Sequence, residues 1–202
     1  FREYIQNQGI PNDKIVFYPN PTEAFYKQLN EVKEYKEFFH NGFFNIVFAG
    51  NIGEAQSIKT IIEAINKIKK LPVKLVILGD GRYKETALRL IKEKELESHF
   101  NFIGSFPPAE MPKFFSHADA LLVSLKKNKI FSLTIPAKVQ SYLACGKPII
   151  ASLDGSGAKI IADAKCGVVS PAENSNILCE RIEKLMSLDK YKLNEMGVNA
   201  RD

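Results

Sequence analysis

The sequence predicts an α/β fold: a doubly wound, mostly parallel sheet of the Rossmann-like kind. Short runs rich in Val, Ile, Leu and Phe recur along the chain and are nearly continuous in apolar residues, as expected of strands covered on both faces. Between them lie longer stretches with apolar residues at helical spacing. Such an alternation of strand and helix favours parallel strands joined by right-handed crossovers.

Seven segments have the pattern of strands and six have the pattern of helices. The predicted strands are residues 14–18, 45–49, 74–78, 101–103, 120–124, 148–151 and 168–169. The predicted helices are residues 58–68, 83–95, 109–117, 137–144, 158–164 and 175–187. In the first of these helices five isoleucines recur at helical spacing.

Length and composition indicate one globular domain, since 202 residues with 45% hydrophobic side chains can bury a sizeable core. No stretch approaches the ~20 apolar residues of a membrane span, and the start shows no signal-peptide pattern. The chain begins without methionine, so we expect an internal part of a longer protein.

The formal net charge of +5 is spread over lysines on predicted helix faces, which is typical of a solvated surface. An anionic ligand or an anionic membrane surface is the alternative interpretation. No basic run is interleaved with aromatic residues, so a nucleic-acid partner is not expected.

Cysteine and histidine patterns predict neither a disulfide framework nor a metal site. Cys145, Cys166 and Cys179 form no C-x-x-C pair, and reduced thiols are the simplest interpretation. The three histidines lack ligand spacing, so no zinc site is predicted. The glycine loops lack both G-x-G-x-x-G and GK[ST], which argues against an NAD enzyme and a P-loop NTPase. No cofactor is expected.

Three successive strands run into glycine-containing loops. The loops are residues 50–53, 79–82 and 104–105, which begin at Gly50, Gly79 and Gly104. Ligands of open parallel sheets bind beyond the carboxyl ends of the strands, where glycine lets the backbone approach a ligand closely. The sequence therefore predicts a binding crevice at this edge, although ordinary tight turns would also use glycine.

The helix predicted at residues 137–144 carries the clearest chemical signal. Thr134 is placed to cap it and Pro136 to begin its first turn, while Gly146 and Pro148 mark its end. Free amides and the helix dipole make such an N-terminus an anion site. Lys138 lies in the first turn, where the dipole disfavours a cation, and this indicates a missing anion such as a diphosphate. A surface lysine on an ordinary helix is the alternative.

Several sequence blocks, in their order along the chain, resemble the carboxy-terminal domain of family 4 retaining glycosyltransferases of the GT-B fold. The likeness is greatest to bacterial enzymes of capsule, O-antigen or colanic-acid synthesis. The blocks are residues 50–64 (Gly-Asn-Ile-Gly … Ile-Ile-Glu-Ala), 79–81 (Gly-Asp-Gly), 102–104 (Phe-Ile-Gly), 118–122 (Ala-Asp-Ala-Leu-Leu), 136–138 (Pro-Ala-Lys), 142–148 (Tyr-Leu-Ala-Cys-Gly-Lys-Pro) and 166–168 (Cys-Gly-Val).

This resemblance implies a domain plan. Residues 1–20 would be an interdomain segment with the pattern G-x-P-x-x-K-I-x-x-x-P-N from Gly9 to Asn20. Residues 21–188 would form the donor domain, which binds the nucleotide sugar, and residues 189–202 would start the helix that returns to the first domain. The amino-terminal acceptor domain would be absent, and we expect the isolated part to be inactive.

The chain departs from the family at the donor signature. The two family glutamates, thought to contact the transferred sugar and the ribose, fall at Leu133 and Ser141. The family arginine and lysine that bind the diphosphate fall at Asn51 and Gln56. Lys138 and the helix amides would then hold the diphosphate. Lys59 or Arg82 would be the helping cation.

The resemblance implies metal-independent transfer of a sugar from a UDP-sugar, or a GDP-sugar, to a lipid-linked saccharide, with the acceptor bound by the missing domain. It implies a cytoplasmic protein, in some members associated with the inner face of the plasma membrane. The base would lie near residues 103–105, the ribose near Ser141 and the sugar near residues 133–136. The expected donor-binding residues are Gly50, Asn51, Gly53, Gly79, Gly81, Arg82, Ile103, Gly104, Ser105, Thr134, Ile135, Pro136, Lys138 and Ser141.

No catalytic residue and no metal ligand can be assigned; the chain has no D-x-D pair, and Ser-His-Asp or Cys-His sets are not evident. Two other functions stay open. A nucleotide-sugar 2-epimerase shares the GT-B architecture but needs acidic and histidine groups at the cleft. A degenerate, non-catalytic module that binds sugar nucleotides would explain the loss of both glutamates.

Overall fold

Six parallel strands form one sheet in the computed structural model, which describes residues 1–16, 18 and 20–201. Their order is β3-β2-β1-β4-β5-β6, and each neighbouring pair is parallel. The strands are β1 (Phe44–Ala49), β2 (Val73–Leu78), β3 (Phe100–Gly104), β4 (Ala120–Ser124), β5 (Ile149–Ser152) and β6 (Gly167–Ser170). The predicted doubly wound α/β fold is confirmed.

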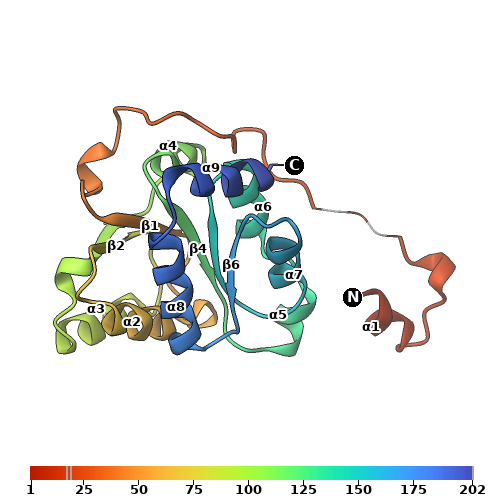
Figure 1. Cartoon of the computed structure of the whole chain (residues 1–202). Helices are drawn as coiled ribbons and strands as arrows, with labels where there is room; N and C mark the ends of the chain where they lie inside the picture. Colours follow the sequence, from red (N-terminus) through yellow and green to blue (C-terminus); the bar gives the residue numbers. More distant parts are fainter. Residues whose placement is uncertain (17, 19, 202) are drawn as a thin grey trace.

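The helices are α1 (Arg2–Gln6), α2 (Ile58–Lys67), α3 (Lys84–Glu93), α4 (Met111–Ser116), α5 (Lys129–Leu133), α6 (Ala137–Ala144), α7 (Ser156–Asp163), α8 (Ser175–Met186) and α9 (Lys190–Asn199). Helices α2 to α7 lie in the crossovers between strands, α8 and α9 follow the last strand, and α1 lies apart from the sheet (Figure 1). All six predicted helices are present. The short helices α1 and α5 were not predicted.

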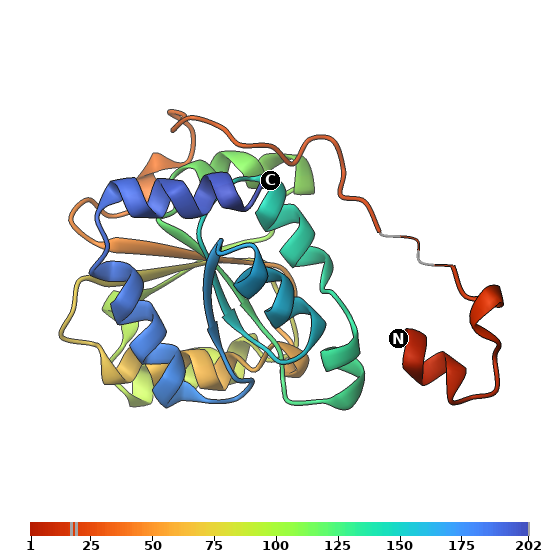
Figure 2. The ribbon, with the colours of Figure 1, turned by 45° about the vertical axis from the view of Figure 1, so that its right-hand side comes forward.

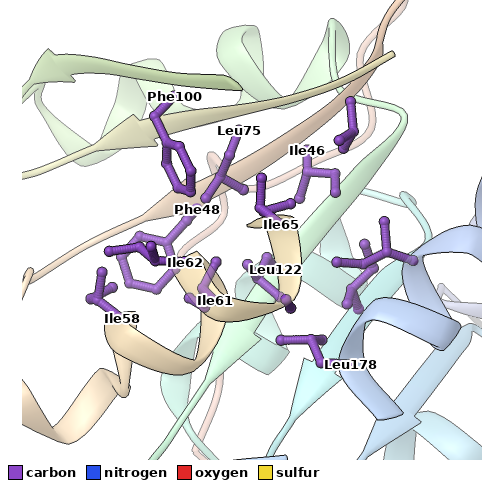
Figure 3. Close-up of a cluster of buried hydrophobic side chains, with 14 of the residues drawn as sticks. Ile46, Phe48, Ile58, Ile61, Ile62, Ile65, Leu75, Phe100, Leu122 and Leu178 are labelled. Atoms are coloured by element: carbon purple, nitrogen blue, oxygen red, sulfur yellow. The ribbon is translucent and has the colours of Figure 1, made fainter. Parts of the chain in front are cut away.

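Two apolar clusters lie on opposite faces of the sheet. Because successive strand residues point to opposite faces, Ile46 and Phe48 of β1 join one cluster and Val47 and Ala49 join the other. Helices α2, α3 and α8 cover the first cluster, which Figure 3 shows around the isoleucines of α2. Helices α4, α6 and α7 cover the second (Figure 2). Each fully buried isoleucine contributes about 1.5–3 kcal/mol.

The described residues of the predicted first strand, residues 14–18, do not form a strand. Lys14 ends a short 3-10 helix (Asn12–Lys14), and the side chains of Val16 and Tyr18 are 83% and 86% exposed. Phe17 lies outside the described residues. The segment has the apolar pattern of a strand, but its described residues pair with no strand of the sheet. Without such a partner, the backbone N–H and C=O groups of a strand would lack their hydrogen bonds.

The chain direction around the sheet reverses between β1 and β4. From β1 the chain passes outward to β2 and β3, then returns to place β4 on the other side of β1. At such a switch point the two adjacent strand-to-helix loops turn apart and leave a crevice at the carboxyl ends of the strands. In the described part of the chain, no helix is long and apolar enough to span a membrane.

Candidate functional site

A cavity of about 480 Å³ lies at the carboxyl ends of β1 and β2, against the start of α6. Its walls include Gly50 and Gly79, which follow the two strands directly, and Lys138 and Ser141 on α6. The cavity therefore borders the switch point through β1 and through α6, which follows β4 in the chain, and it lies at the edge where the glycine loops predicted a crevice.

Gly50 and Gly79 have positive φ angles of 132° and 134°, a region that favours glycine. The N–H of Gly50 donates to Leu78 O at 2.7 Å, and a side chain at position 79 would collide with the carbonyl oxygen of Gly50. These glycines allow the loops after β1 and β2 to pack against each other. Packing within the chain therefore requires glycine at these two positions, whether or not a ligand also does.

Lys138, the second residue of α6, extends across the end of β1. Its side chain passes through the space that a Cβ at position 50 would fill, with Nζ 2.7 Å from that point. Nζ ends 4.4 Å from the centroid of the Phe48 ring. Within the described residues no carboxylate lies within 4.0 Å of Lys138 Nζ. Burial lowers the pKa of Lys138 to about 8, because a charged group loses hydration there.

The N-terminus of α6 lies beside Lys138. Pro136 is the N-cap residue and no side chain caps the helix. The predicted cap by Thr134 is wrong: its hydroxyl donates to Phe131 O at 3.0 Å and closes α5 instead. Uncapped first-turn amides and a cation therefore occupy the same end of the cavity, where an anion can bind. At the other end of α6, Gly146 adopts φ +61° directly after the C-cap residue, as predicted.

Tyr142 holds α6 against the end of β1. Its hydroxyl oxygen accepts a hydrogen bond from the N–H of Ala49 at 3.1 Å, and its side chain is fully buried. Tyr142 lies one helical turn after Lys138, on the same face of α6. This bond sets the position of Lys138 relative to Gly50.

Eleven of the fourteen predicted donor-binding residues divide among three cavities. Six line the first: Gly50, Asn51, Gly79, Ser105, Lys138 and Ser141. Asn51 also lines a neighbouring cavity of about 700 Å³ together with Gly53, Gly81 and Arg82. Thr134 and Ile135 lie with Leu133 in a third cavity, beside α1. Ile103, Gly104 and Pro136 line none of these three.

The two other cations considered for the diphosphate lie outside the first cavity. Lys59 pairs with Glu63 at 3.9 Å on the exposed side of α2. Arg82 lines only the neighbouring cavity. Gln56 uses its side-chain oxygen to accept the N–H of Gly53 at 3.2 Å, which shapes the loop after β1. Lys138 is therefore the cation that the structure places in the first cavity.

Sequence reasoning missed several wall residues. Phe106 follows Ser105 in the loop after β3, so extending that predicted loop by one residue would have found it. Met111 and Phe115 belong to α4, whose apolar face could be predicted but not its contact with the cavity. Glu23 and Tyr26 come from a segment without helix or strand, and no motif marks them.

The described residues contain no group of three or more His, Cys, Asp or Glu side chains that could hold a metal ion. The three cysteines are buried and unpaired, and burial raises the pKa of the Cys145 thiol to about 12. A thiol of that pKa is not a nucleophile at neutral pH.

Two curated relatives share the sequence pattern. A probable glycosyltransferase, WbjE, of Pseudomonas aeruginosa is 27% identical over 148 residues, which cover 72% of this chain and 36% of the relative. A putative colanic acid biosynthesis glycosyltransferase, WcaL, of Escherichia coli is 22% identical over 98% of this chain and 48% of the relative. The chain thus spans between a third and a half of the length of these relatives.

Solved structures share the fold. Anabaena Alr3699/HepE in complex with UDP and glucose superposes with a TM-score of 0.66 at 20% identity, over 79% of this chain and 42% of that one. The C-terminal domain of the glycosyl transferase group 1 family protein LpcC of Francisella tularensis has a TM-score of 0.70 at 21% identity. That match covers 90% of this chain and 94% of the LpcC domain.

The family assignment comes from the greater part of the chain. Residues 30–202, which include all six strands and every wall residue of the first cavity except Glu23 and Tyr26, match the family model of glycosyl transferases group 1. With the sheet order, the switch-point cavity and the relatives in agreement, the chain belongs to the glycosyl transferases group 1 family.

Proposed function

We propose that this chain is the carboxy-terminal, donor-binding domain of a retaining, metal-independent family 4 glycosyltransferase. The whole enzyme transfers a sugar from a UDP-sugar, or a GDP-sugar, to a lipid-linked saccharide during synthesis of a bacterial cell-surface polysaccharide. The observation that carries the proposal is the unpaired cation Lys138 beside the uncapped N-terminus of α6, in a cavity at the switch point of the sheet.

This arrangement suits a leaving nucleoside diphosphate. As the glycosidic bond to the donor breaks, negative charge grows on the diphosphate, and preorganised amides and cations stabilise it. Lys138 and the first-turn amides of α6 supply such groups without a metal ion. The missing family cations at Asn51 and Gln56 leave Lys138 as the main charge for this task.

The donor would lie across the first cavity with its parts in a defined order. The diphosphate lies against Gly50, Lys138 and the amides of α6, the ribose near Ser141 and the base near Ser105. Ser105 and Lys138 line the same cavity, which supports one nucleotide contacting both. The UDP in the Anabaena structure supports a uridine nucleotide as the ligand class.

The proposed domain plan assigns residues 1–20 to an interdomain segment, 21–188 to the donor domain and 189–202 to the start of a return helix. Two findings support it: the chain spans 36% and 48% of its curated relatives, and it covers 94% of the Francisella C-terminal domain. The remaining part of the enzyme would bind the acceptor, and the E. coli relative's name supports a polysaccharide pathway.

A degenerate module that binds a sugar nucleotide without transferring sugar is the second candidate. The observation that favours it is the absence of a carboxylate at Leu133 and Ser141, the positions of the two family glutamates. In addition, the Ser141 hydroxyl donates to Ala137 O at 3.1 Å, so its proton is already used within α6.

Saturation-transfer NMR of this chain with UDP, GDP, dTDP, ADP and NAD, with and without EDTA, tests the proposal. We expect selective UDP or GDP signals that survive EDTA and are lost in Lys138→Met. Lys59→Met is the matched control, since it removes an exposed lysine outside the cavity. Transfer by the full-length enzyme then separates the transferase from the degenerate module. Absence of nucleotide binding by the full-length enzyme would contradict both.

A further inference from the structure

Residues 20–28 form a segment, here called the strap, that is anchored to α6 at one end and to Arg201, after α9, at the other. The side-chain amide of Gln140 donates to Asn20 O at 2.6 Å, and Arg201 Nη1 donates to the Gln28 side-chain oxygen at 3.2 Å. Between these anchors the N–H of Tyr26 donates to Glu23 O at 3.0 Å and closes a turn. The strap therefore holds Glu23 and Tyr26 at the wall of the first cavity, facing α6.

Glu23 and Lys138 bring opposite charges to one cavity without pairing. In the described part of the chain, no cation lies within 4.0 Å of the Glu23 carboxylate. Its one recorded side-chain contact is with the Thr22 hydroxyl, at 3.5 Å. The other carboxylate of the wall, Asp80, already accepts the N–H of Gly81 at 2.7 Å and pairs with Lys84 at 3.5 Å. Glu23 is therefore the carboxylate left available to a ligand.

The two unpaired charges specify complementary ends of a ligand. Lys138 requires an anion, whereas an ionised carboxylate can only accept hydrogen bonds and repels negative charge. A ligand that contacts both residues must therefore present an anionic group to Lys138 and hydrogen-bond donors such as hydroxyls to Glu23. A nucleoside diphosphate has this distribution, because its ribose carries two adjacent O–H donors on the side away from the phosphates. Hydrogen bonds to an ionised acceptor are about twice as strong as neutral ones.

We propose that the Glu23 carboxylate accepts hydrogen bonds from the ribose hydroxyls of the bound nucleoside diphosphate and selects ribonucleotides over deoxyribonucleotides. This inference rests on the proposed function, which supplies the ligand class. It assigns a specificity role to the strap, which lies outside the strand-to-helix loops and the helices α4 and α6 that form the rest of the cavity wall. Dinucleotide-binding domains with parallel sheets also place a carboxylate side chain where it accepts a hydrogen bond from a ribose hydroxyl.

Binding of UDP and of 2′-deoxyuridine diphosphate to this chain, measured by calorimetry, tests the inference. The parent chain should bind UDP about tenfold more tightly than the deoxy compound. In Glu23→Gln the ratio of the two affinities should fall towards one, because the preference comes from the 2′-hydroxyl, and the deoxy compound, which keeps its 3′-hydroxyl, should lose less affinity than UDP. The control is Glu37→Gln, which removes an exposed carboxylate outside the cavity, and it should keep the parent ratio.

The outcomes separate the inference from the function on which it rests. If Glu23→Gln keeps the parent's preference for UDP, the ribose is not bound by Glu23 and the inference is wrong, although the donor site stands. If the parent binds UDP and its deoxy form equally, the inference is also wrong. If the parent chain and the full-length enzyme bind neither, the proposed function itself fails. Melting temperatures of both variants confirm that the fold is kept.

Discussion

The ammonium group of Lys138 lies 4.4 Å from the centroid of the Phe48 ring, across the end of β1. The ring face offers partial electrostatic compensation to a cation that has no carboxylate beside it. The side chain reaches this place only because position 50 has no Cβ. One helix residue, one strand residue and one glycine thus combine to hold an unsatisfied positive charge in the cavity.

The affinity for UDP should fall as the pH rises above about 8. Burial lowers the Lys138 pKa to about 8, so the free protein loses the positive charge of Lys138 above this pH. A bound diphosphate stabilises the protonated form of Lys138, which therefore keeps its charge in the complex. Because binding then requires uptake of a proton, the affinity should drop by up to about tenfold per pH unit. Calorimetry in buffers of different ionisation enthalpy measures both the affinity and the proton uptake. An affinity that stays constant from pH 7 to 9.5 would contradict the assignment.

Lys138→Met should not destabilise the unliganded chain at neutral pH, because it removes a poorly hydrated, unpaired charge. In the parent the folded-state pKa of Lys138 is about 8, below the ordinary lysine value of 10.5. Between these values the unfolded chain binds more protons, so the free energy of unfolding of the parent rises with pH. Burial also lowers the pKa of Lys147, and this residue adds a similar rise in the free energy of unfolding to the parent and to the variant.

The difference between parent and variant therefore isolates Lys138. Urea unfolding should show that the free energy of unfolding increases more between pH 7.5 and pH 10 for the parent than for Lys138→Met. Equal increases would mean that Lys138 titrates as an exposed lysine and would argue against its burial in the cavity.

Gly50→Ala should weaken UDP binding without unfolding the chain. A Cβ there would meet Lys138 Cε at 2.5 Å, and the flexible lysine end would move out of the cavity. The positive φ adds a cost of about 1–2 kcal/mol to folding. Gly42→Ala is the control, since Gly42 also has a positive φ of 82° but has no atom within 4 Å of the Cβ position. Gly42→Ala should lose stability but keep its affinity for UDP. An equal loss of UDP affinity in Gly50→Ala and Gly42→Ala would refute the steric argument.

Tyr142→Phe should lower the free energy of unfolding by about 1–3 kcal/mol, since it leaves the buried N–H of Ala49 without a partner. It should also reduce UDP affinity, because Tyr142 fixes α6 and with it Lys138. Chemical unfolding and calorimetry measure the two effects. Tyr191→Phe removes a hydroxyl from a side chain that is 78% exposed, and we expect it to change neither.

The sheet was predictable because its strands are buried on both faces. In β1 and β4 nearly every side chain is apolar, and the isoleucines of α2 recur at the spacing of a covered helix face. Residues 14–18 have a comparable apolar pattern, but their described residues pair with no strand, and a local pattern does not show which distant segment a strand pairs with. Helix α5 was missed because five residues show no periodicity, although Asn128 accepts the N–H of Ile130 at 2.8 Å as its N-cap.

The candidate site was predictable where it depends on strand ends and helix starts. Gly50, Gly79 and Lys138 were expected at one edge and line one cavity. Glu23 and Tyr26 were not, because they reach the cavity through two side-chain contacts of the strap with α6 and the C-terminal end. The two contacts join residues that are separated by 120 and by 173 positions in the sequence, and no spacing rule predicts such contacts.

We expect Lys138 to bind the diphosphate of a nucleotide at the switch point of the sheet. Phosphorus NMR of UDP, titrated with the parent chain and with Lys138→Met in the presence of EDTA, tests it most directly. The β-phosphate resonance should shift clearly with the parent and at most slightly with Lys138→Met, while Lys59→Met should behave as the parent. An equal shift with the parent and with Lys138→Met would contradict it.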